Sequence, residues 1–409
     1  MTMISNVALS IGSGGGDNIM NDIVSPFKPH WDLYPKAYVA PKISFPLIDH
    51  LDGDLTKDVW KDVSFSDIFH DIRGDKDAPN EDKPNSNCRT RFKAVWDDSF
   101  LYIGAILESD FETQAHFTDH NSPIYQRDSD FELFVDPFGS CHNYKELEVN
   151  AINTVWNLML DWPYDDGGEE HSGRISEPGD DRYYEVHHQK TATKLLRGTL
   201  NDSNGSATWS IEVALSYKDL LVHTNNSGKS SIPSVGNMMR INFSRVERQG
   251  AINWTWQPQV VWDPANHRYS GYVAMHLPDS WGYMIFGGTK SIAQTDHGDN
   301  EDIDIEQLES ETLSVPRDST WPGRIAAMNI YYAQRYFSDQ NNGTYAASIE
   351  KLEGLLDNEI VRPFKIRIEL VPGGFVATVS GNPDGSYVTI TNDRLLQDVG
   401  PSAVGVTTA

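Results

Sequence analysis

The middle of the chain, from residue 43 to residue 286, consists of short hydrophobic runs that alternate with polar positions. Residues 91–96 and 101–107 show the pattern, and Asp97 and Asp98 stand between them. A hydrophobic period of two is typical of strands that bury one face, and paired aspartates favour a tight turn. This segment therefore predicts a β-hairpin.

Runs of the same kind recur along this region, at 131–135, 144–150, 154–160, 184–189, 192–200, 208–214, 239–247, 253–256 and 281–286. Helical spacing is found there only at 217–223. Many short strands with turn residues between them indicate a mainly β fold. We expect an antiparallel, jelly-roll-like β-sandwich over residues 41–288.

The pattern differs on both sides of this region. Residues 1–40 are rich in Gly, Ser and Asn and then in Pro and aromatic residues, which predicts a flexible N-terminal arm. Residues 289–316 carry many acidic residues and no Lys or Arg after Lys290, which predicts a linker.

Residues 317–396 combine both periodicities. Hydrophobic residues recur at helical spacing from 325 to 336, and a second short helix is expected at 346–356. Three strands should follow, at 364–370, 375–379 and 387–391. We interpret this part as a small α+β appendage that offers a surface for a protein partner, with residues 397–409 as a tail.

The net charge of −26, from 59 acidic and 33 basic residues, limits the classes of molecule that this protein can bind. Phosphate backbones and anionic membranes need clustered Lys and Arg, so nucleic acid is an unfavourable partner for this acidic protein. No apolar run reaches the roughly 18 residues of a membrane span, and the N-terminus lacks the basic and apolar pattern of a standard secretory signal. We expect a soluble protein, and an extracellular location stays open.

An ordered series of phrases connects the sandwich region to a known family. The stretch LDGDLTKDVW at 51–60 is followed by VWDDSFLYI, RDSDFELFVDP, NYKELEVNAIN, WSIEVA, RINFSRVE and WGYMIF. Over roughly residues 41–288 this series resembles the family 9 carbohydrate-binding modules. The resemblance implies a non-catalytic sandwich that grips glycan ends between aromatic rings, with polar strand residues on the sugar hydroxyls and calcium supporting nearby loops.

The resemblance also suggests ligand-binding residues. Glu132 and Asn150 match family positions that hydrogen-bond the sugar, and Tyr125 stands where one of two stacking tryptophans is expected. The segment around Met275 and His276 has no tryptophan at the second place. Other side chains could complete the site, namely Trp156, Trp254 and Trp256 as stacking rings and Arg91 as a further donor.

Acidic residues concentrate beside these positions. Glu146 and Glu148 lie two apart on one strand and so point the same way, with Asp128, Asp130 and Asp136 nearby in the sequence. Hard cations take six to eight oxygen ligands, so we expect a calcium site among these five residues, the alternative being a solvated acidic edge.

The chain shows no nucleophile or metalloprotease motif. Three functions stay open: carbohydrate binding, an assembly protein that keeps the sandwich without binding sugar, and a glycan-active enzyme. Cys88 and Cys141 are the only cysteines, and the sequence leaves open whether they pair.

Overall fold

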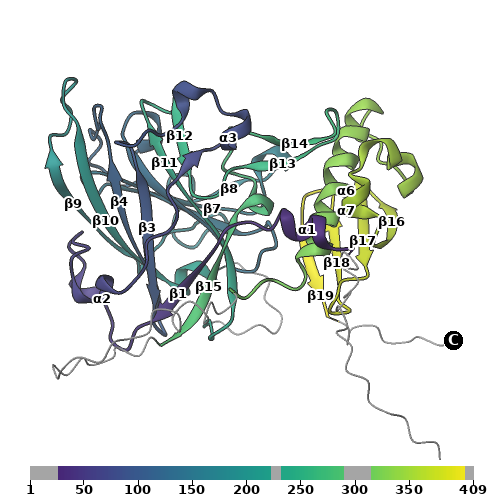
Figure 1. Ribbon diagram of the computed structural model, residues 1–409, viewed down its shortest axis with the longest axis horizontal. Helices are drawn as coiled ribbons and strands as arrows, with labels where there is room; N and C mark the ends of the chain where they lie inside the picture. Colours follow the sequence, from purple (N-terminus) through teal and green to yellow (C-terminus); the bar gives the residue numbers. More distant parts are fainter. Residues whose placement is uncertain (1–25, 223–231, 290–314, 401–409) are drawn as a thin grey trace, which may run out of the picture.

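The computed structural model describes residues 26–222, 232–289 and 315–400. The expected linker at 289–316 lies almost wholly outside these residues. Figure 1 shows a large β unit beside a smaller unit built from the C-terminal helix and strands. Within the described ranges, no helix is long and apolar enough to cross a membrane.

The strands of the large unit are mostly antiparallel and form one hydrogen-bonded path in the order β8-β7-β6-β5-β11-β15-β1-β3-β4-β10-β9. Two short strands, β2 and β12, join it beside β11, and β13 pairs with β14 in a separate hairpin. Their bounds are β1 Ala37–Lys42, β2 His70–Asp71, β3 Thr90–Trp96, β4 Phe100–Glu108, β5 Asp130–Asp136, β6 Tyr144–Asn150, β7 Val155–Leu160, β8 Glu170–His171, β9 Lys190–Gly198, β10 Ala207–Ser216, β11 Met238–Glu247, β12 Ile252–Thr255, β13 Val260–Asp263, β14 Arg268–Gly271 and β15 Gly282–Thr289.

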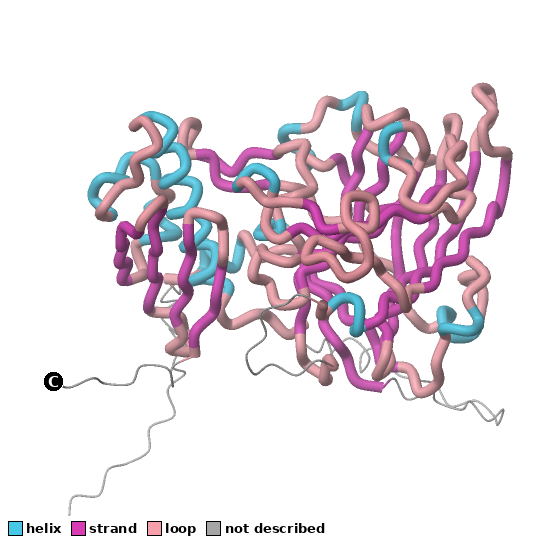
Figure 2. The backbone as a smooth tube through the Cα atoms, turned by 180° about the vertical axis from the view of Figure 1, so that it is seen from behind, coloured by secondary structure: helices cyan, strands magenta, loops and turns pink. Residues whose placement is uncertain are grey.

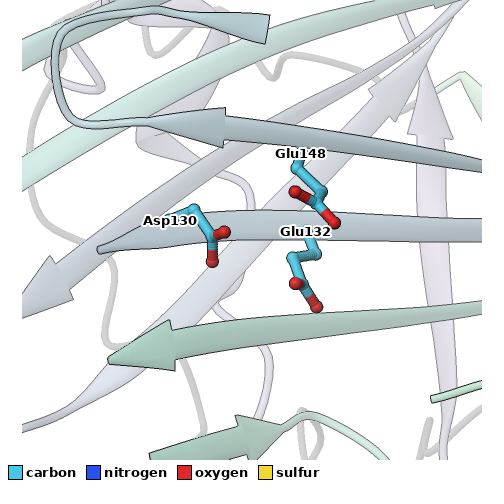
Figure 3. Close-up of side chains that lie close together, drawn as sticks. All are labelled: Asp130, Glu132 and Glu148. Carbon is cyan, nitrogen blue, oxygen red and sulfur yellow. The ribbon is translucent and has the colours of Figure 1, made fainter. Parts of the chain in front are cut away.

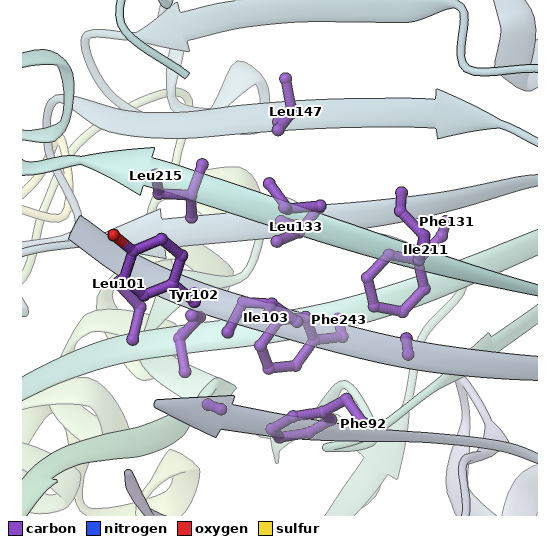
Figure 4. Packing of buried hydrophobic residues seen from close by; sticks show 14 of the residues in the cluster. Phe92, Leu101, Tyr102, Ile103, Phe131, Leu133, Leu147, Ile211, Leu215 and Phe243 are labelled. Atoms are coloured by element: carbon purple, nitrogen blue, oxygen red, sulfur yellow. The ribbon is translucent and has the colours of Figure 1, made fainter. Parts of the chain in front are cut away.

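This path folds over so that two faces pack against each other (Figure 4). Phe92 of β3 lies against Phe243 of β11 with ring centroids 4.1 Å apart, and Phe243 also stacks on Phe131 of β5 at 5.8 Å. Ile103 and Ile211 pack in the same cluster from the β4 and β10 side. The mainly β, antiparallel sandwich predicted from the alternating pattern is confirmed.

Strand β1 departs from the antiparallel pattern. It runs parallel to β15, from Ala37 opposite Tyr283 to Ala40 opposite Phe286, and it also pairs parallel with β3. The sheet therefore includes residues before the boundary expected at 41. Pro41 lies where the register shifts between Ala40 and Lys42, which is a position where a strand tolerates proline.

The prediction of a strand at residues 184–189 is wrong. Tyr184 and Val186 are buried, but the segment follows an irregular course and β9 begins only at Lys190. The backbone N–H of Val186 donates to the side chain of Asn157, and that of His188 donates to Asp219. Side-chain acceptors thus replace the strand partner that the alternation predicts.

Short helices occupy the connections of the large unit. They are α2 Asp58–Lys61, α3 Gly74–Asp77 and α4 Tyr217–Leu220, together with the 3-10 turns η1 Ile48–His50, η2 Asn80–Asp82, η3 Ile124–Gln126, η4 Tyr164–Asp166 and η5 Pro278–Ser280. Helix α1 Lys28–Asp32 precedes β1 and contacts helices of the small C-terminal unit. Cys88 and Cys141 are both buried and free, and the Cys88 thiol donates to Asp110, so they do not form a disulfide.

The small unit packs one long helix on a four-stranded antiparallel sheet, seen from behind in Figure 2. Its elements are α6 Trp321–Gln340, η6 Ile349–Leu355, α7 Asn358–Val361, β16 Lys365–Val371, β17 Gly374–Ser380, β18 Tyr387–Thr391 and β19 Leu396–Val399. Helix α6 contacts β17 and β18. Strand β19 adds a fourth strand to the three expected and extends into the segment expected to be a tail.

Buried ion pairs join the two units. Arg394, in the turn between β18 and β19, lies 2.9 Å from Asp166 and 3.0 Å from Asp279, both of the large unit. The Asp166 carboxylate also accepts hydrogen bonds from Tyr331 and Arg335 of α6. These charged groups are compensated only while the two units stay in contact.

We expect Arg394→Met to lower the free energy of unfolding by about 3–5 kcal/mol, because Asp279 is then buried without a cation and Asp166 keeps only Arg335. The matched control is Arg367→Met, whose partner is Glu369 and whose side chain is 76% exposed. This exposed pair should contribute less than about 1 kcal/mol. Urea unfolding of both variants measures the difference, and equal small losses would contradict a buried joint.

Candidate functional site

A row of polar side chains crosses the outer face of the half-sheet β11-β5-β6-β7. Ser244 lies opposite Glu132, Glu132 opposite Glu148, and Glu148 opposite Trp156. Directly opposed residues of antiparallel strands point to the same side of the sheet. The neighbours of Glu132 in β5, Phe131 and Leu133, belong to the sandwich core, so this row points away from that core.

Loops close over this face and leave a pocket of about 420 Å³. The strands supply its floor and the loops supply its walls. The residues that line it are Tyr125, Glu132, Phe134, Glu146, Glu148, Trp156, Tyr164, Glu170, Val246, Gly250, Asn253, Val273, Ala274, Met275 and His276. The pocket thus brings together five of the residues singled out in the sequence, namely Tyr125, Trp156, Glu132, Glu146 and Glu148.

Two pairs of contacting aromatic rings line the pocket. Tyr125 contacts Trp156 edge-on at 5.5 Å, and Tyr164 contacts His276 edge-on at 4.8 Å. Tyr164 is 45% exposed, so its ring is open to a ligand. Arg174 lies over the Trp156 ring at 4.0 Å. Burial lowers the pKa of His276 to about 4, so this side chain is neutral at physiological pH.

Three carboxyl groups converge at the floor, as Figure 3 shows for Asp130, Glu132 and Glu148. One carboxyl oxygen of each residue lies within 4.8 Å of one oxygen of each of the other two. The exposed fractions are 0% for Asp130, 4% for Glu132 and 2% for Glu148. Val246 N–H donates to Asp130 Oδ1 at 3.2 Å. Asp130 Oδ2 and Glu148 Oε2, by contrast, receive no hydrogen bond from an N–H or hydroxyl group of the described residues.

This burial changes the acidity of the cluster. Burial raises the pKa of Glu132 to about 7, against a weaker opposing effect from Ser244. It also raises the pKa values of Asp130, Glu146 and Glu148, and repulsion from Glu132 raises each of them further. Carboxyl groups that repel each other in a poorly solvated pocket favour a proton, a cation or a hydrogen-bonding ligand.

Asn150 and Asp128 do not line the pocket. Asn150 Nδ2 donates to Asp128 Oδ2 at 2.8 Å and to the carbonyl oxygen of Phe117 at 2.9 Å. Asp128 also accepts from the backbone N–H groups of His116 and Phe117. Both side chains are buried and hold the loop before β5, which is a structural role that their sequence positions do not reveal.

The remaining expected residues also lie elsewhere. Trp254 and Trp256 belong to the sandwich core, where Trp254 Nε1 donates to the carbonyl oxygen of Asp82 and Trp256 packs on Phe92. Trp254 pairs opposite Arg245 of β11, and the backbone N–H of Trp256 donates to the carbonyl oxygen of Phe243. Arg91 lies over the Phe65 ring, and Asp136 accepts from the backbone N–H of Cys141.

Tyr164 and Glu170 of the pocket and Arg174 over Trp156 were not expected from the sequence, and all three come from the segment that follows β7. A turn signal was available there in Pro163 and the two glycines at 167–168. A Cβ at Gly168 would lie 1.7 Å from the Trp162 carbonyl oxygen, so the loop needs glycine to fold back. That signal marks the turn but not the pocket that it reaches.

Neither a protein-family model nor a curated protein matches the chain. Among solved structures, it is similar to a family 9 carbohydrate-binding module from Caldicellulosiruptor kristjanssonii in complex with cellotriose, with 17% identity, coverage of 64% of this chain and 100% of the module, and a TM-score of 0.35. A family 9 module from the same organism in complex with glucose has 16% identity, with coverage of 66% of this chain and 100% of the module and a TM-score of 0.34. A proposed carbohydrate-binding protein from Bacteroides uniformis has 16% identity, with coverage of 62% of this chain and 99% of that protein and a TM-score of 0.41.

We expect the raised pKa of Glu132 to make stability fall as pH rises. Unfolded Glu132 loses its proton near pH 4.5, whereas the folded side chain keeps it until about pH 7. Between these pH values the folded state binds one more proton than the unfolded state, so the free energy of unfolding falls by about 1.4 kcal/mol for each unit that the pH rises. Glu132→Gln removes this contribution. Urea unfolding with a chelator present should therefore show wild type losing stability relative to the variant across this window, and a constant difference would contradict the raised pKa.

Proposed function

We propose that the pocket above β5, β6 and β7 binds carbohydrate without catalysis, taking a glycan end or a short oligosaccharide. The observation that carries the proposal is the meeting of Glu132, Glu146 and Glu148 with the rings of Trp156 and Tyr164 in one pocket. Sugar hydroxyls need fixed hydrogen-bond acceptors, and the C–H face of a sugar ring needs a flat apolar surface.

The size and position of the pocket support the same ligand class. A volume of about 420 Å³ falls within the range of roughly 300–1,000 Å³ that is usual for small-molecule sites. The carboxyl groups stand on adjacent strands of a hydrogen-bonded sheet, so little conformational entropy is lost when a ligand binds. A short saccharide fits such a pocket better than an extended polymer chain does.

Hydrolysis of a glycosidic bond is less well supported. Glycosidases place two carboxyl groups across the bond, about 5–10 Å apart. Glu132, Glu146 and Glu148 instead stand side by side on one face of the sheet. An assay of glycoside hydrolysis by wild type, Glu146→Gln and Glu148→Gln keeps this alternative testable, because activity that both variants lose would favour an enzyme.

A purely structural role for the pocket is also less well supported. A structural face would be expected to pair its buried polar atoms, whereas Glu146 Oε2 and Glu148 Oε2 have no donor among the described residues. Buried acceptors that open onto a pocket can be satisfied by the hydroxyl groups of a ligand.

We expect calorimetric titration with a panel of mono- and oligosaccharides to show binding to the full chain. Tyr164→Ala should weaken it by about 1–3 kcal/mol, because the exposed ring loses its contact with the sugar face. Phe45→Ala is the matched control, since Phe45 is similarly exposed but does not line the pocket. An equal affinity of the two variants for the sugar, or no binding by wild type, would contradict the proposal.

A further inference from the structure

The acids at the floor of the pocket differ from Glu247 and Glu212, two other buried acids of the large unit. Glu247 accepts from the Ser129 hydroxyl and forms an ion pair with Arg245 at 2.6 Å. Glu212 accepts from Trp60 Nε1 and from Lys57. Buried acids here are thus normally satisfied by donors or a basic group.

Asp130, Glu132 and Glu148 have no basic partner in the described part of the chain, although Val246 N–H donates to Asp130 Oδ1 and Ser244 contacts Glu132. None of them forms an ion pair among the described residues, and the nearby basic groups are already engaged, Arg245 by Glu247 and Arg174 by Glu170. Asp130 Oδ2 and Glu148 Oε2 are buried and have no hydrogen-bond donor. Three adjoining acids without a counter-charge need a positive partner to be buried as carboxylates.

The spacing of these oxygens fits a hard cation. Calcium binds oxygen at about 2.3–2.6 Å, so two ligand oxygens on opposite sides of the ion stand about 5 Å apart. The three carboxyl groups offer one oxygen each, all within 4.8 Å of one another. The absence of thiol and imidazole ligands from this triad disfavours zinc relative to calcium or magnesium.

We infer that Asp130, Glu132 and Glu148 bind a divalent cation, of which calcium is the expected ion, and that the cation presents its remaining coordination positions to the pocket. Glu132 and Glu148 line the pocket, whereas Asp130, two residues before Glu132 on the same face of β5, is fully buried and does not line it. Three protein oxygens leave at least three of the six to eight calcium positions for other ligands. Adjacent hydroxyl groups of a sugar can fill two of them.

The residues that would hold calcium differ in part from the five expected from the sequence. Asp130 and Glu148 stay in the set and Glu132 joins them. Asp128 and Asp136 are occupied by backbone N–H groups, and Glu146 lines the pocket outside the triad. The bridging role rests on the proposed carbohydrate function, whereas the cation site itself does not.

The direct test is calorimetric titration of calcium chloride into the full chain after treatment with a chelator. We expect one site in wild type and an affinity at least tenfold lower in Glu148→Gln. Glu353→Gln is the matched control, because Glu353 is an exposed glutamate of η6 that does not line the pocket. No calcium binding by wild type, or the same affinity in Glu148→Gln, would overturn the cation site.

Thermal unfolding separates loss of the site from loss of the fold. Glu148→Gln replaces a buried acid that has no basic partner among the described residues by an uncharged side chain of the same shape, so without calcium its melting temperature should equal or exceed that of wild type. With calcium, wild type alone should gain stability from binding. A calcium-induced shift of equal size in both proteins would place the ion elsewhere.

Sugar titrations with calcium and with chelator test the bridging role. A loss of at least tenfold in sugar affinity on chelation is expected if the cation holds the hydroxyl groups. Unchanged affinity would overturn the bridge while leaving the proposed sugar binding intact. Calcium binding by a chain that binds no sugar would support the ion site and contradict the proposed function.

Discussion

The cost of burying carboxyl groups is the constraint around which this site is organised. Asp130, Glu132, Glu146 and Glu148 stand on one outer sheet face with little solvent and without an ion-pair partner among the described residues. The opposite face of the same strands packs into a core of aromatic and aliphatic side chains, and that core can stabilise strands whose outer face is unfavourable. The sandwich thus supplies the rigid support, and the acids supply the chemistry.

The small C-terminal unit is connected to the same pocket. Asp166, which pairs with Arg394, comes two residues after Tyr164 in η4. Asp279, the other partner of Arg394, comes three residues after His276. One buried arginine therefore fixes both loops that bring Tyr164 and His276 together, which gives the C-terminal unit a direct influence on the shape of the pocket.

Much of the large unit could be predicted because alternation reports which strand face is buried. The same parity places Glu132, Glu146 and Glu148 on one side of the sheet. Alternation fails where side chains replace backbone partners, as at residues 184–189, and where a strand contains proline, as in β1. It also does not distinguish an acid that opens onto a pocket from Asp128, which caps a loop, because hydrogen bonds between distant segments decide that difference.

The central claim is that the uncompensated carboxyl groups and the aromatic rings form one ligand site. A crystal structure of the full chain grown with calcium and a bound saccharide tests it most directly. The account predicts an ion about 2.3–2.6 Å from oxygens of Asp130, Glu132 and Glu148, with a sugar ring against Tyr164 or Trp156. Carboxyl groups that pair only with one another, with the saccharide bound at another surface, would contradict it.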